Sequence, residues 1–360
     1  MNIRSEVILA PYTTFQIGGP ARLFCPVSSK VELVEAVNFA KSNSLPIFVL
    51  GKGSNLLVSD AGFPGLVIKN EIMGIEFHKK SDSENAGGEF FVTAGAGETW
   101  DDLVDETVRR GLHGIENLSA IPGTVGAAPV QNIGAYGSEI ADTLVSVQAL
   151  DTKSMEFVDL SGAECRFAYR DSIFKHEKGR YVITQVTLRL MRDGAVDISY
   201  RDLKEYFTGE SRQCRVTGKE ASDGKIAPSI KDVRDAVISI RLSKLPDWTH
   251  WGTAGSFFKN PVIPASQYAE LVQRYPGLPG FPSADGMVKV SLGWILDKIC
   301  NVKEMASDLK KVHSYERQAL VLVTTPGATA AEVIKLAHEL IDMVKVKTGI
   351  EIEGEVEWVC

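Results

Sequence analysis

The sequence predicts an α+β protein of two or three domains, the last of which is a smaller α/β domain. The chain of 360 residues is long for a single hydrophobic core. Predicted strands outnumber helices in its middle part, whereas helices gather around one strand beyond residue 246. With 44% hydrophobic and 24% charged residues, the composition is that of an ordinary globular protein.

Charge, cysteines and histidines exclude several classes of protein. A formal net charge of −7 argues against a general nucleic-acid binder. The N-terminal residues reach charge before any apolar run, so we expect neither a signal peptide nor a membrane segment, and a cytoplasmic location. The five cysteines form no C-x-x-C pair and the six histidines no H-E-x-x-H spacing, so we expect reduced thiols and no metal site.

The first part of the chain has a strand–helix–strand pattern. Ser29 and Glu32 predict a capping box in front of a helix whose apolar stripe includes Val31. The strand predicted at 45–50 runs into Gly51-Lys-Gly-Ser-Asn55, a glycine turn at the kind of strand end where open α/β sheets bind ligands. More strand follows this turn, so the dinucleotide-binding G-x-G-x-x-G pattern, which opens a helix, is absent.

Later elements are predicted from similar signals. Thr99 is expected to cap a helix that ends at Gly111, and Thr329 with Glu332 to box the start of a helix that ends at Gly349. The other predicted elements are strands at 22–26, 56–59, 65–69, 89–97, 143–152, 156–160, 181–190 and 319–325, helices at 229–240, 266–274 and 291–300, and an alternating strand at 350–359.

An uncharged, glycine-rich stretch runs from Asn117 to Ser138. It contains no Asp, Glu, Lys or Arg, although 24% of the whole chain is charged. Its four glycines can adopt positive φ and let a ligand lie against the backbone: Gly123, Gly126, Gly134 and Gly137. The alternative is a buried connector whose glycines serve turns only. Together with the turn at 51–55, the stretch predicts a backbone cradle for a long, phosphate-bearing ligand.

Three side chains are candidates for chemistry, and each has an alternative structural role. Ser256, in Gly255-Ser-Phe-Phe-Lys-Asn-Pro261, is a proton donor or an ST-turn residue, and no G-x-S-x-G pattern supports a hydrolase triad. Arg170 is a fixed cation or a partner in a surface salt bridge. Glu355 belongs to a row of glutamates that a period of two places opposite Trp358 and its apolar neighbours, and such a row is solvated by default.

Seven motifs follow one another along the whole chain: Thr13-Thr-Phe-x-Ile-Gly-Gly19, Gly51-x-Gly-Ser-Asn55, Ile121-Pro-Gly-Thr-Val-Gly-Ala127, Gln131-Asn-Ile-Gly-Ala-Tyr-Gly137, Tyr169-Arg-Asp-Ser172, Gly255-Ser-Phe-Phe-Lys-Asn-Pro261 and Glu353-x-Glu-Val356. In this combination the sequence resembles the UDP-N-acetylenolpyruvoylglucosamine reductase (MurB) family from end to end. The segment 198–203 favours the subclass with a tyrosine lid over the substrate.

The resemblance implies a fold. It is the FAD-binding fold of the vanillyl-alcohol-oxidase type, with FAD-binding subdomains at 1–75 and 76–245 and a substrate-binding domain at 246–349; the strand near 350–360 joins the first subdomain. The polar stretch 209–228 departs from the family pattern, and we expect a mobile surface insertion there.

The resemblance also implies roles for individual residues. The cofactor-binding residues would be Gly51, Gly53, Ser54, Asn55, Gly123, Thr124, Gly126, Ala127 and Tyr136. The general acid falls on Ser256, with Arg170 and Glu355 as its catalytic partners. The nucleotide sugar or NADPH would meet Tyr200, Lys244, Asn260 and Gln318.

The implied activity is that of an NADPH-dependent oxidoreductase with non-covalent FAD. Hydride from the reduced flavin N5 and a proton from Ser256 would convert UDP-N-acetylglucosamine enolpyruvate to UDP-N-acetylmuramate, a peptidoglycan precursor on which cell wall biogenesis, cell shape and cell division depend. We expect a monomer with no nucleic-acid or membrane partner.

Two other functions are alternatives to this activity. Another flavin oxidase of the same fold would usually tether its flavin through a histidine, and neither 51–60 nor 117–138 contains one. A nucleotide-binding scaffold without turnover would have no use for the acid beside the flavin.

Overall fold

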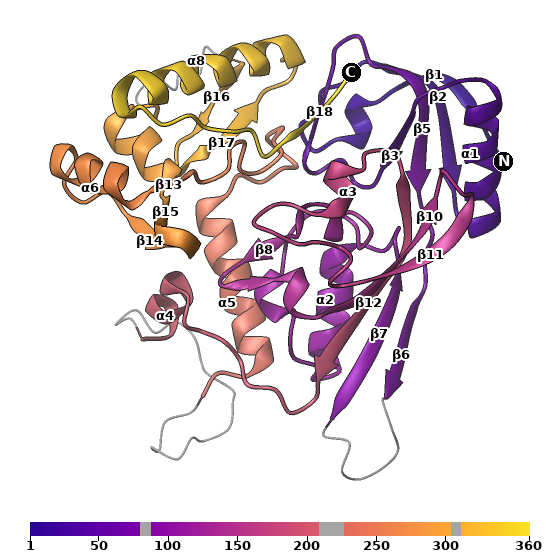
Figure 1. Cartoon of the computed structure of the whole chain (residues 1–360), viewed down its shortest axis with the longest axis horizontal. Helices are drawn as coiled ribbons and strands as arrows, with labels where there is room; N and C mark the ends of the chain where they lie inside the picture. Colours follow the sequence, from indigo (N-terminus) through magenta and orange to yellow (C-terminus); the bar gives the residue numbers. More distant parts are fainter. Residues whose placement is uncertain (80–87, 209–226, 304–310) are drawn as a thin grey trace. The chain divides into compact units, whose positions relative to one another are not determined.

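The computed structural model describes residues 1–79, 88–208, 227–303 and 311–360. The chain forms two compact units, and Figure 1 shows the ribbon of the whole chain. The larger unit comprises Met1–Ser5, Leu23–Lys52 and Gly65–Ser243, and the smaller comprises Glu6–Arg22, Gly53–Pro64 and Lys244–Cys360. Most of the predicted insertion at 209–228 lies outside the described residues.

The strands are β1 (Arg4–Ile8), β2 (Pro20–Val27), β3 (Ile47–Leu50), β4 (Leu56–Val58), β5 (Phe63–Asn70), β6 (Ile75–Lys79), β7 (Glu89–Gly95), β8 (Gly134–Ala135), β9 (Ser138–Glu139), β10 (Leu144–Asp151), β11 (Glu156–Ser161), β12 (Tyr181–Met191), β13 (Val262–Pro264), β14 (Gly280–Pro282), β15 (Met287–Val290), β16 (Val312–Tyr315), β17 (Gln318–Thr324) and β18 (Glu357–Val359).

The α-helices are α1 (Lys30–Ser42), α2 (Trp100–Arg109), α3 (Ile173–His176), α4 (Arg201–Thr208), α5 (Ile230–Lys244), α6 (Ala265–Arg274), α7 (Leu292–Trp294) and α8 (Ala330–Thr348). The 3₁₀ turns are η1 (Ala10–Tyr12), η2 (Glu116–Leu118), η3 (Pro129–Gln131), η4 (Ile140–Asp142) and η5 (Ala284–Gly286), and η6 (Ile295–Ile299) is a π-helix.

An antiparallel sheet of order β11-β10-β12-β7-β6 supports the larger unit. Along β12, Val186 and Leu188 are buried whereas Arg189 is exposed, as expected of a strand with one covered face. Helix α2 covers that face, because Trp100 and Leu103 belong to the same core cluster as Val186 and Leu188 (Figure 1). The strand and helix predictions for 89–110, 143–152 and 181–190 are confirmed.

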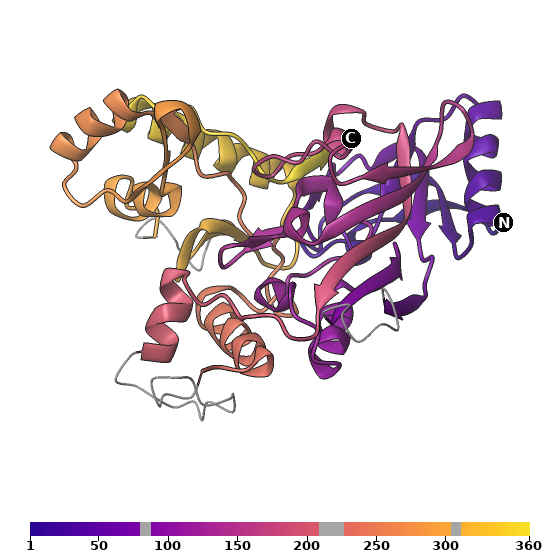
Figure 2. The same ribbon diagram turned by 60° about the horizontal axis from the view of Figure 1, so that its bottom comes forward.

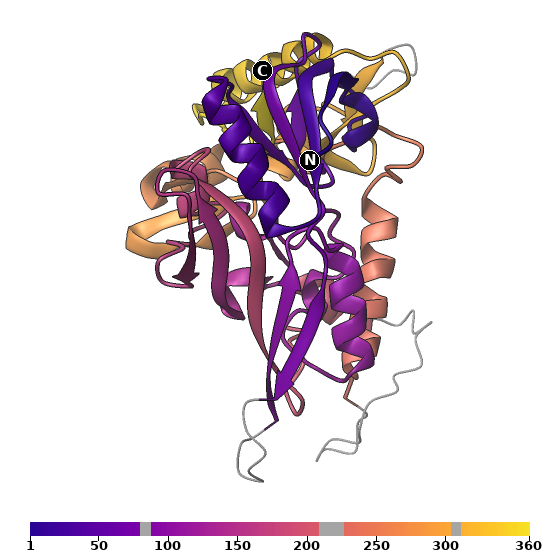
Figure 3. The same cartoon turned by 90° about the vertical axis from the view of Figure 1, so that its right-hand side faces the viewer.

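A second sheet, of order β1-β2-β5-β3, carries helix α1 on one face (Figure 3). Leu33 and Val37 of α1 pack with Leu66 of β5. The prediction that Val31 lies on the apolar stripe was wrong, since Val31 is 69% exposed. The buried residues of α1 are Leu33, Ala36, Val37 and Ala40, and Val31 falls on the opposite side of a helix with that spacing.

The predicted capping box of α1 is only half formed. The Ser29 hydroxyl accepts from the Glu32 N–H at 3.2 Å, as the pattern indicates. The Glu32 carboxylate accepts instead from the N–H and hydroxyl of Ser28, each at 2.8 Å. Two donors on Ser28 satisfy the carboxylate better than the single N–H of Ser29 would.

Helices α4 and α5 lie side by side in the larger unit (Figure 2). Leu203 of α4 is fully buried with Val233 and Val237 of α5. Helix α5 begins one residue later than predicted and extends to Lys244.

The smaller unit is built around helix α8 and the hairpin β16–β17 (Figure 1). The capping box of Thr329 and Glu332 is confirmed, and Gly349 ends α8 in the left-handed region at φ 71°. A three-stranded sheet of order β13-β15-β14 and helix α6 complete this core.

Two predictions for the smaller unit were wrong in detail. The segment 350–359 is not one alternating strand: only Glu357–Val359 is strand, paired in parallel with β4. The chain changes partner just before it, since the N–H of Glu355 donates to Phe257 whereas that of Glu357 donates to Asn55. Trp358, expected on the apolar face, is 44% exposed. The helix predicted at 291–300 is a short α-helix that continues as the π-helix η6.

Two kinds of feature are absent from the described ranges, a membrane-spanning helix and a metal-binding cluster. No helix there is both long enough and apolar enough to cross a membrane. Nor do His, Cys, Asp or Glu side chains of the described residues form a group of three that could hold a metal ion.

Candidate functional site

The two glycine-rich segments predicted to hold a phosphate meet within the larger unit. A Cβ atom on Gly51 would lie 2.6 Å from the Thr124 hydroxyl, so only glycine fits there. Lys52 donates to the Thr99 hydroxyl at 2.7 Å. Thr99 does precede α2, but its side chain makes no capping bond, so that predicted role was wrong. The lysine ammonium competes for the hydroxyl oxygen that would otherwise accept from the helix N–H groups.

Several backbone amides at this junction are not used by the protein. Among the described residues, no acceptor takes the N–H of Lys52, Gly123 or Thr124. Unbonded amides in a glycine-rich loop with no carboxylate of its own are suited to an anion such as a diphosphate. The residues at the junction therefore fit the phosphate-bearing ligand that the sequence predicts.

Only two of the four cradle glycines use the left-handed region. Gly123 has φ 139° and Gly137 has φ 88°, but Gly126 and Gly134 do not have positive φ. At Gly126 the requirement is close packing, because a Cβ would lie 2.5 Å from that of Ala96. The amides of Gly126 and Ala127 already donate to Ala96 and Thr124, so these two residues shape the loop rather than offer donors.

The remainder of the glycine turn belongs to the smaller unit. Gly53 has φ 62°, and a Cβ there would lie 2.3 Å from the carbonyl oxygen of Tyr12. The Asn55 side chain donates to the Glu355 carbonyl at 3.1 Å, and the N–H of Glu357 donates to the Asn55 carbonyl at 3.0 Å. Asn55 thus joins a predicted cofactor-binding segment to a predicted catalytic one.

Ser256 lies in a segment held between two others in the smaller unit. The N–H of Phe257 donates to Leu320 of β17 at 2.8 Å, and Phe257 accepts from the N–H of Glu355 at 2.8 Å. Ser256 is half-buried, and its hydroxyl has no partner among the described residues. The structure therefore places the backbones of Ser256 and Glu355 on neighbouring segments.

Arg170 contacts the uncharged stretch within the larger unit. Its guanidinium donates to the carbonyl of Gly134 at 2.8 Å and to that of Asn132 at 3.5 Å. Its backbone is left-handed at φ 55°, and its carbonyl accepts from Lys175 at 2.7 Å. Because the residue is held at both ends, the guanidinium has a fixed place beside the stretch.

Two tyrosines from the prediction contact each other in the larger unit. The rings of Tyr136 and Tyr200 meet edge to face, 5.5 Å apart at 82°. Burial raises the pKa of Tyr136 to about 12, against the opposing effect of Arg241, which hydrogen-bonds to it. Tyr200 itself is 45% exposed.

The other predicted substrate residues have local roles in the smaller unit. The Asn260 side chain accepts from the N–H of Leu292 at 3.0 Å and so holds the start of α7. The Gln318 amide oxygen lies 3.1 Å from the place that a Cβ on Gly293 would take. Lys244 is the last residue of α5.

The predicted site residues divide between the two units. The larger unit holds Gly51, Gly123, Thr124, Gly126, Ala127, Tyr136, Arg170 and Tyr200. The smaller unit holds Gly53, Ser54, Asn55, Lys244, Ser256, Asn260, Gln318 and Glu355.

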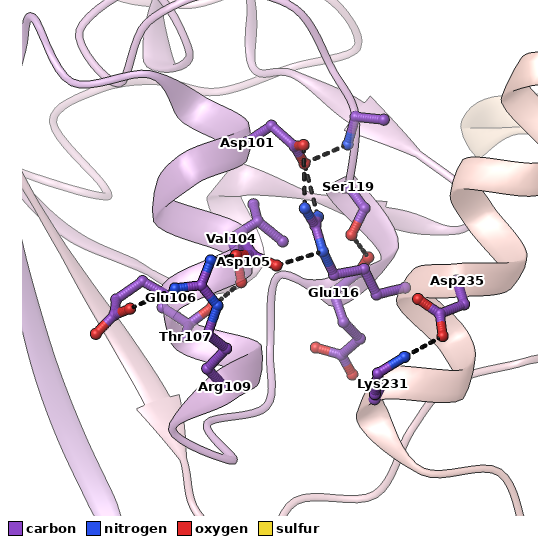
Figure 4. A network of polar contacts seen from close by, with 12 residues as sticks. Asp101, Val104, Asp105, Glu106, Thr107, Arg109, Glu116, Ser119, Lys231 and Asp235 are labelled. Atoms are coloured by element: carbon purple, nitrogen blue, oxygen red, sulfur yellow. Dashed lines mark hydrogen bonds and ion pairs between the residues drawn. The ribbon is translucent and has the colours of Figure 1, made fainter. Parts of the chain in front are cut away.

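A partly buried ion pair beneath the uncharged stretch was not predicted from the sequence (Figure 4). Arg234 of α5, only 8% exposed, donates to both oxygens of Asp101 at 2.7 and 3.1 Å and to Asp105 at 3.2 Å. Asp101, in the first turn of α2, also accepts from the N–H of Ala120 at 2.6 Å. The sequence does contain an indication of this ion pair, since Arg234 lies on the same helical face as Ile230 and Val237, where an apolar residue is expected.

The acid dependence of stability should report this ion pair. Burial alone would raise the pKa of Asp101, but the hydrogen bonds from Arg234 and Ala120 outweigh it, so the pKa lies below its ordinary value of 3.8. Its contribution to the free energy of unfolding is therefore complete above that pH and lost as the pH falls through the folded-state pKa. We expect Asp101→Asn to be less stable than wild type at pH 7, with a difference that shrinks towards pH 3, in thermal unfolding followed by circular dichroism. A difference that grows on acidification would contradict this assignment.

Comparisons with known proteins agree with this arrangement. Residues 20–160 match the family model described as FAD binding domain, and 247–359 match the model described as UDP-N-acetylenolpyruvoylglucosamine reductase, C-terminal domain. The chain is 42% identical over 357 residues to UDP-N-acetylenolpyruvoylglucosamine reductase of Chromobacterium violaceum, which covers 99% of this chain and 98% of the relative. The reductase of Pseudomonas fluorescens is 40% identical over 355 residues, 99% of this chain and 98% of the relative.

A solved structure extends the comparison to three dimensions. The crystal structure of UDP-N-acetylenolpyruvylglucosamine reductase (MurB) from Thermus caldophilus matches with a TM-score of 0.64 at 26% identity, over 100% of both chains. The likeness therefore spans both compact units rather than the FAD-binding segment alone.

Proposed function

Because the chain belongs to the UDP-N-acetylenolpyruvoylglucosamine reductase family, an FAD-containing oxidoreductase family of peptidoglycan precursor synthesis, we propose that its own substrate is UDP-N-acetylglucosamine enolpyruvate and its reductant NADPH. The product is UDP-N-acetylmuramate. The observation that carries the proposal is the hydrogen bond from the N–H of Glu355 to Phe257, which puts two proposed catalytic residues on neighbouring segments.

FAD, when bound, would supply hydride chemistry, with NADPH as the source of the hydride. The amides of Lys52, Gly123 and Thr124 would hold the pyrophosphate as hydrogen-bond donors, in the loops that also contain Gly51, Gly126 and Ala127. Gly53, Ser54 and Asn55 complete the glycine turn, and Tyr136 lies at the end of the uncharged stretch.

The three catalytic residues act on the enolpyruvyl group. Hydride addition to its terminal carbon leaves negative charge that is shared with the adjoining carboxylate, and the fixed guanidinium of Arg170 stabilises that charge. Glu355, in its protonated form, polarises the same substrate carboxylate. The Ser256 hydroxyl then gives its proton to the neighbouring carbon, so that the double bond gains one hydride and one proton in all.

Four further residues are assigned to the substrate nucleotide or NADPH: Tyr200, Lys244, Asn260 and Gln318. The edge contact between Tyr200 and Tyr136 supports the tyrosine-lid subclass. Lys244 carries the cation that a substrate phosphate requires.

We also propose three structural parts, at 1–75, 76–245 and 246–349. The pairing of β18 with β4 supports adding the C-terminal strand to the first part. We propose a cytoplasmic monomer.

The decisive experiment follows the visible spectrum of the purified protein. NADPH should bleach the flavin, and colour should return under anaerobic conditions when the enolpyruvyl nucleotide is added. A flavin that bleaches but is not reoxidised by this nucleotide would rule out the proposed substrate, and UDP-N-acetylglucosamine serves as the matched control that lacks the reducible group.

The flavin should be released on denaturation. The segments 51–60 and 117–138 contain no histidine or cysteine that could tether it. Cys165 of the larger unit is buried, which raises the pKa of its thiol to about 12 and removes its reactivity as a thiolate. Acid precipitation should leave all yellow colour in the supernatant, and colour retained in the washed pellet would show a covalent bond.

A further inference from the structure

Helix α2 holds the uncharged stretch at three points within the larger unit. The N–H of Trp100 donates to Gly123 at 3.2 Å, and its indole donates to Leu118 at 2.9 Å. Between these two points the Asp101 carboxylate accepts from the N–H of Ala120 at 2.6 Å. The first turn of α2 therefore fixes the loop from which the unused amides of Gly123 and Thr124 project.

The middle contact has to overcome a backbone preference. Ala120 adopts φ 56°, a left-handed conformation that is unfavourable for every residue with a Cβ. The carboxylate that holds it is itself fixed, because both of its oxygens accept from the buried Arg234 guanidinium (Figure 4). Ala120 directly precedes the Ile121-Pro-Gly-Thr124 turn, so its conformation determines where that turn begins.

From this geometry we propose that Asp101 and Arg234 are positioning residues for FAD: their ion pair holds Ala120 in the left-handed conformation and so presents the amides of Gly123 and Thr124 to the cofactor's pyrophosphate. The inference rests on the proposed cofactor role of this loop. Neither residue touches the cofactor; both act through the backbone of Ala120.

Electrostatics and positioning predict opposite results for one substitution. Asp101→Asn removes a negative charge near an anionic ligand, which by charge alone would tighten FAD binding. It also loses the charge-assisted hydrogen bond to Ala120, which by positioning would weaken binding. The dissociation constant of FAD for Asp101→Asn therefore separates the two effects by its direction.

The test uses the full chain stripped of flavin and titrated with FAD alone, with binding followed by quenching of flavin fluorescence. For Asp101→Asn we expect the dissociation constant to rise about tenfold, the worth of a hydrogen bond to a charged group. When Ala120→Gly is added to the Asp101→Asn variant, the dissociation constant should return to within about threefold of wild type, since glycine adopts positive φ without strain. Asp105→Asn is the matched control: it also loses a contact with Arg234 but does not touch Ala120, and its dissociation constant should stay within about twofold.

The rescue distinguishes positioning from simple destabilisation. Ala120→Gly relieves backbone strain with or without Asp101 but replaces no lost contact of Arg234. In an Ala120→Gly background, Asp101→Asn should therefore still lower the unfolding temperature of the flavin-free protein, whereas the proteins with and without Asp101 should bind FAD with similar affinity. Unchanged or tighter FAD binding in Asp101→Asn would overturn the inference, as would equal unfolding temperatures of the Ala120→Gly proteins with and without Asp101. If Asp101→Asn does not fold, Asp101→Glu, which displaces the carboxylate by one methylene, carries the same test. Wild-type protein that binds no FAD would overturn the proposed cofactor role itself.

Discussion

Ser256→Ala should leave the reduction of the flavin by NADPH at a near-native rate and slow its reoxidation by the enolpyruvyl nucleotide about 10²–10⁴-fold, the usual worth of a positioned general acid. The first half-reaction transfers only a hydride, whereas the second also delivers a proton to carbon. The hydroxyl has no partner among the described residues, so its removal leaves the hydrogen bonds of the segment intact.

Stopped-flow measurement of each half-reaction checks this expectation. Ser256→Cys should recover part of the loss, since a thiol can also donate a proton. Thr253→Ser is a suitable control: it keeps the hydroxyl that accepts from the N–H of Gly255 at 3.2 Å, three residues before Ser256. Equal slowing of both half-reactions in Ser256→Ala would mean that the residue organises the segment and is not the acid.

Arg170→Gln should reduce the rate of reoxidation by the enolpyruvyl nucleotide about 10²–10³-fold, as does the loss of one preorganised group that stabilises transition-state charge. Glutamine has no charge to place near the substrate carboxylate, and its shorter side chain also loses the hydrogen bond to the Gly134 carbonyl. Arg170→Lys keeps the charge but loses the planar pair of donors to Gly134 and Asn132, so we expect an intermediate loss of about tenfold.

The matched control is Arg189→Gln, which removes an exposed arginine of the same unit that pairs with Glu89 at 3.7 Å. That variant should retain both half-reactions, because exposed ion pairs contribute little. If Arg170→Gln slowed flavin reduction by NADPH as much as reoxidation, Arg170 would be maintaining the cradle rather than stabilising charge on the substrate.

Local patterns were enough to locate most of the helices and strands. Helix α8 illustrates this, because its capping box and its terminal glycine are both encoded within a few neighbouring residues. Where the pattern misled, a contact distant in sequence was responsible. Trp358 lies in a region of alternating residues, but the chain exchanges one backbone partner for another just before it, and no periodicity reveals which segment will pair.

The candidate site was predictable to the extent that motifs mark it. Glycine-rich segments and the Ser256 motif could be recognised, yet the reason for a given glycine could not: Gly51 is required by Thr124, which is distant in sequence. The ion pair of Asp101 with Arg234 spans 133 positions and joins two helices. Charged residues at core-facing positions indicate that a partner exists, but only the fold identifies it.

The bond from Asn55 to Glu355 has a consequence for the synthesis of the chain. The two residues are 300 positions apart. At a translation rate of roughly 5–20 residues per second, the segment around β4 would wait about 15–60 s for its parallel partner β18. During that interval Leu57, which ends only 2% exposed, faces the solvent on an unpaired strand. Nascent chains of this protein therefore expose the unpaired edge of β4 until β18 has been synthesised, and chaperones that bind short apolar segments should be found on them at that stage.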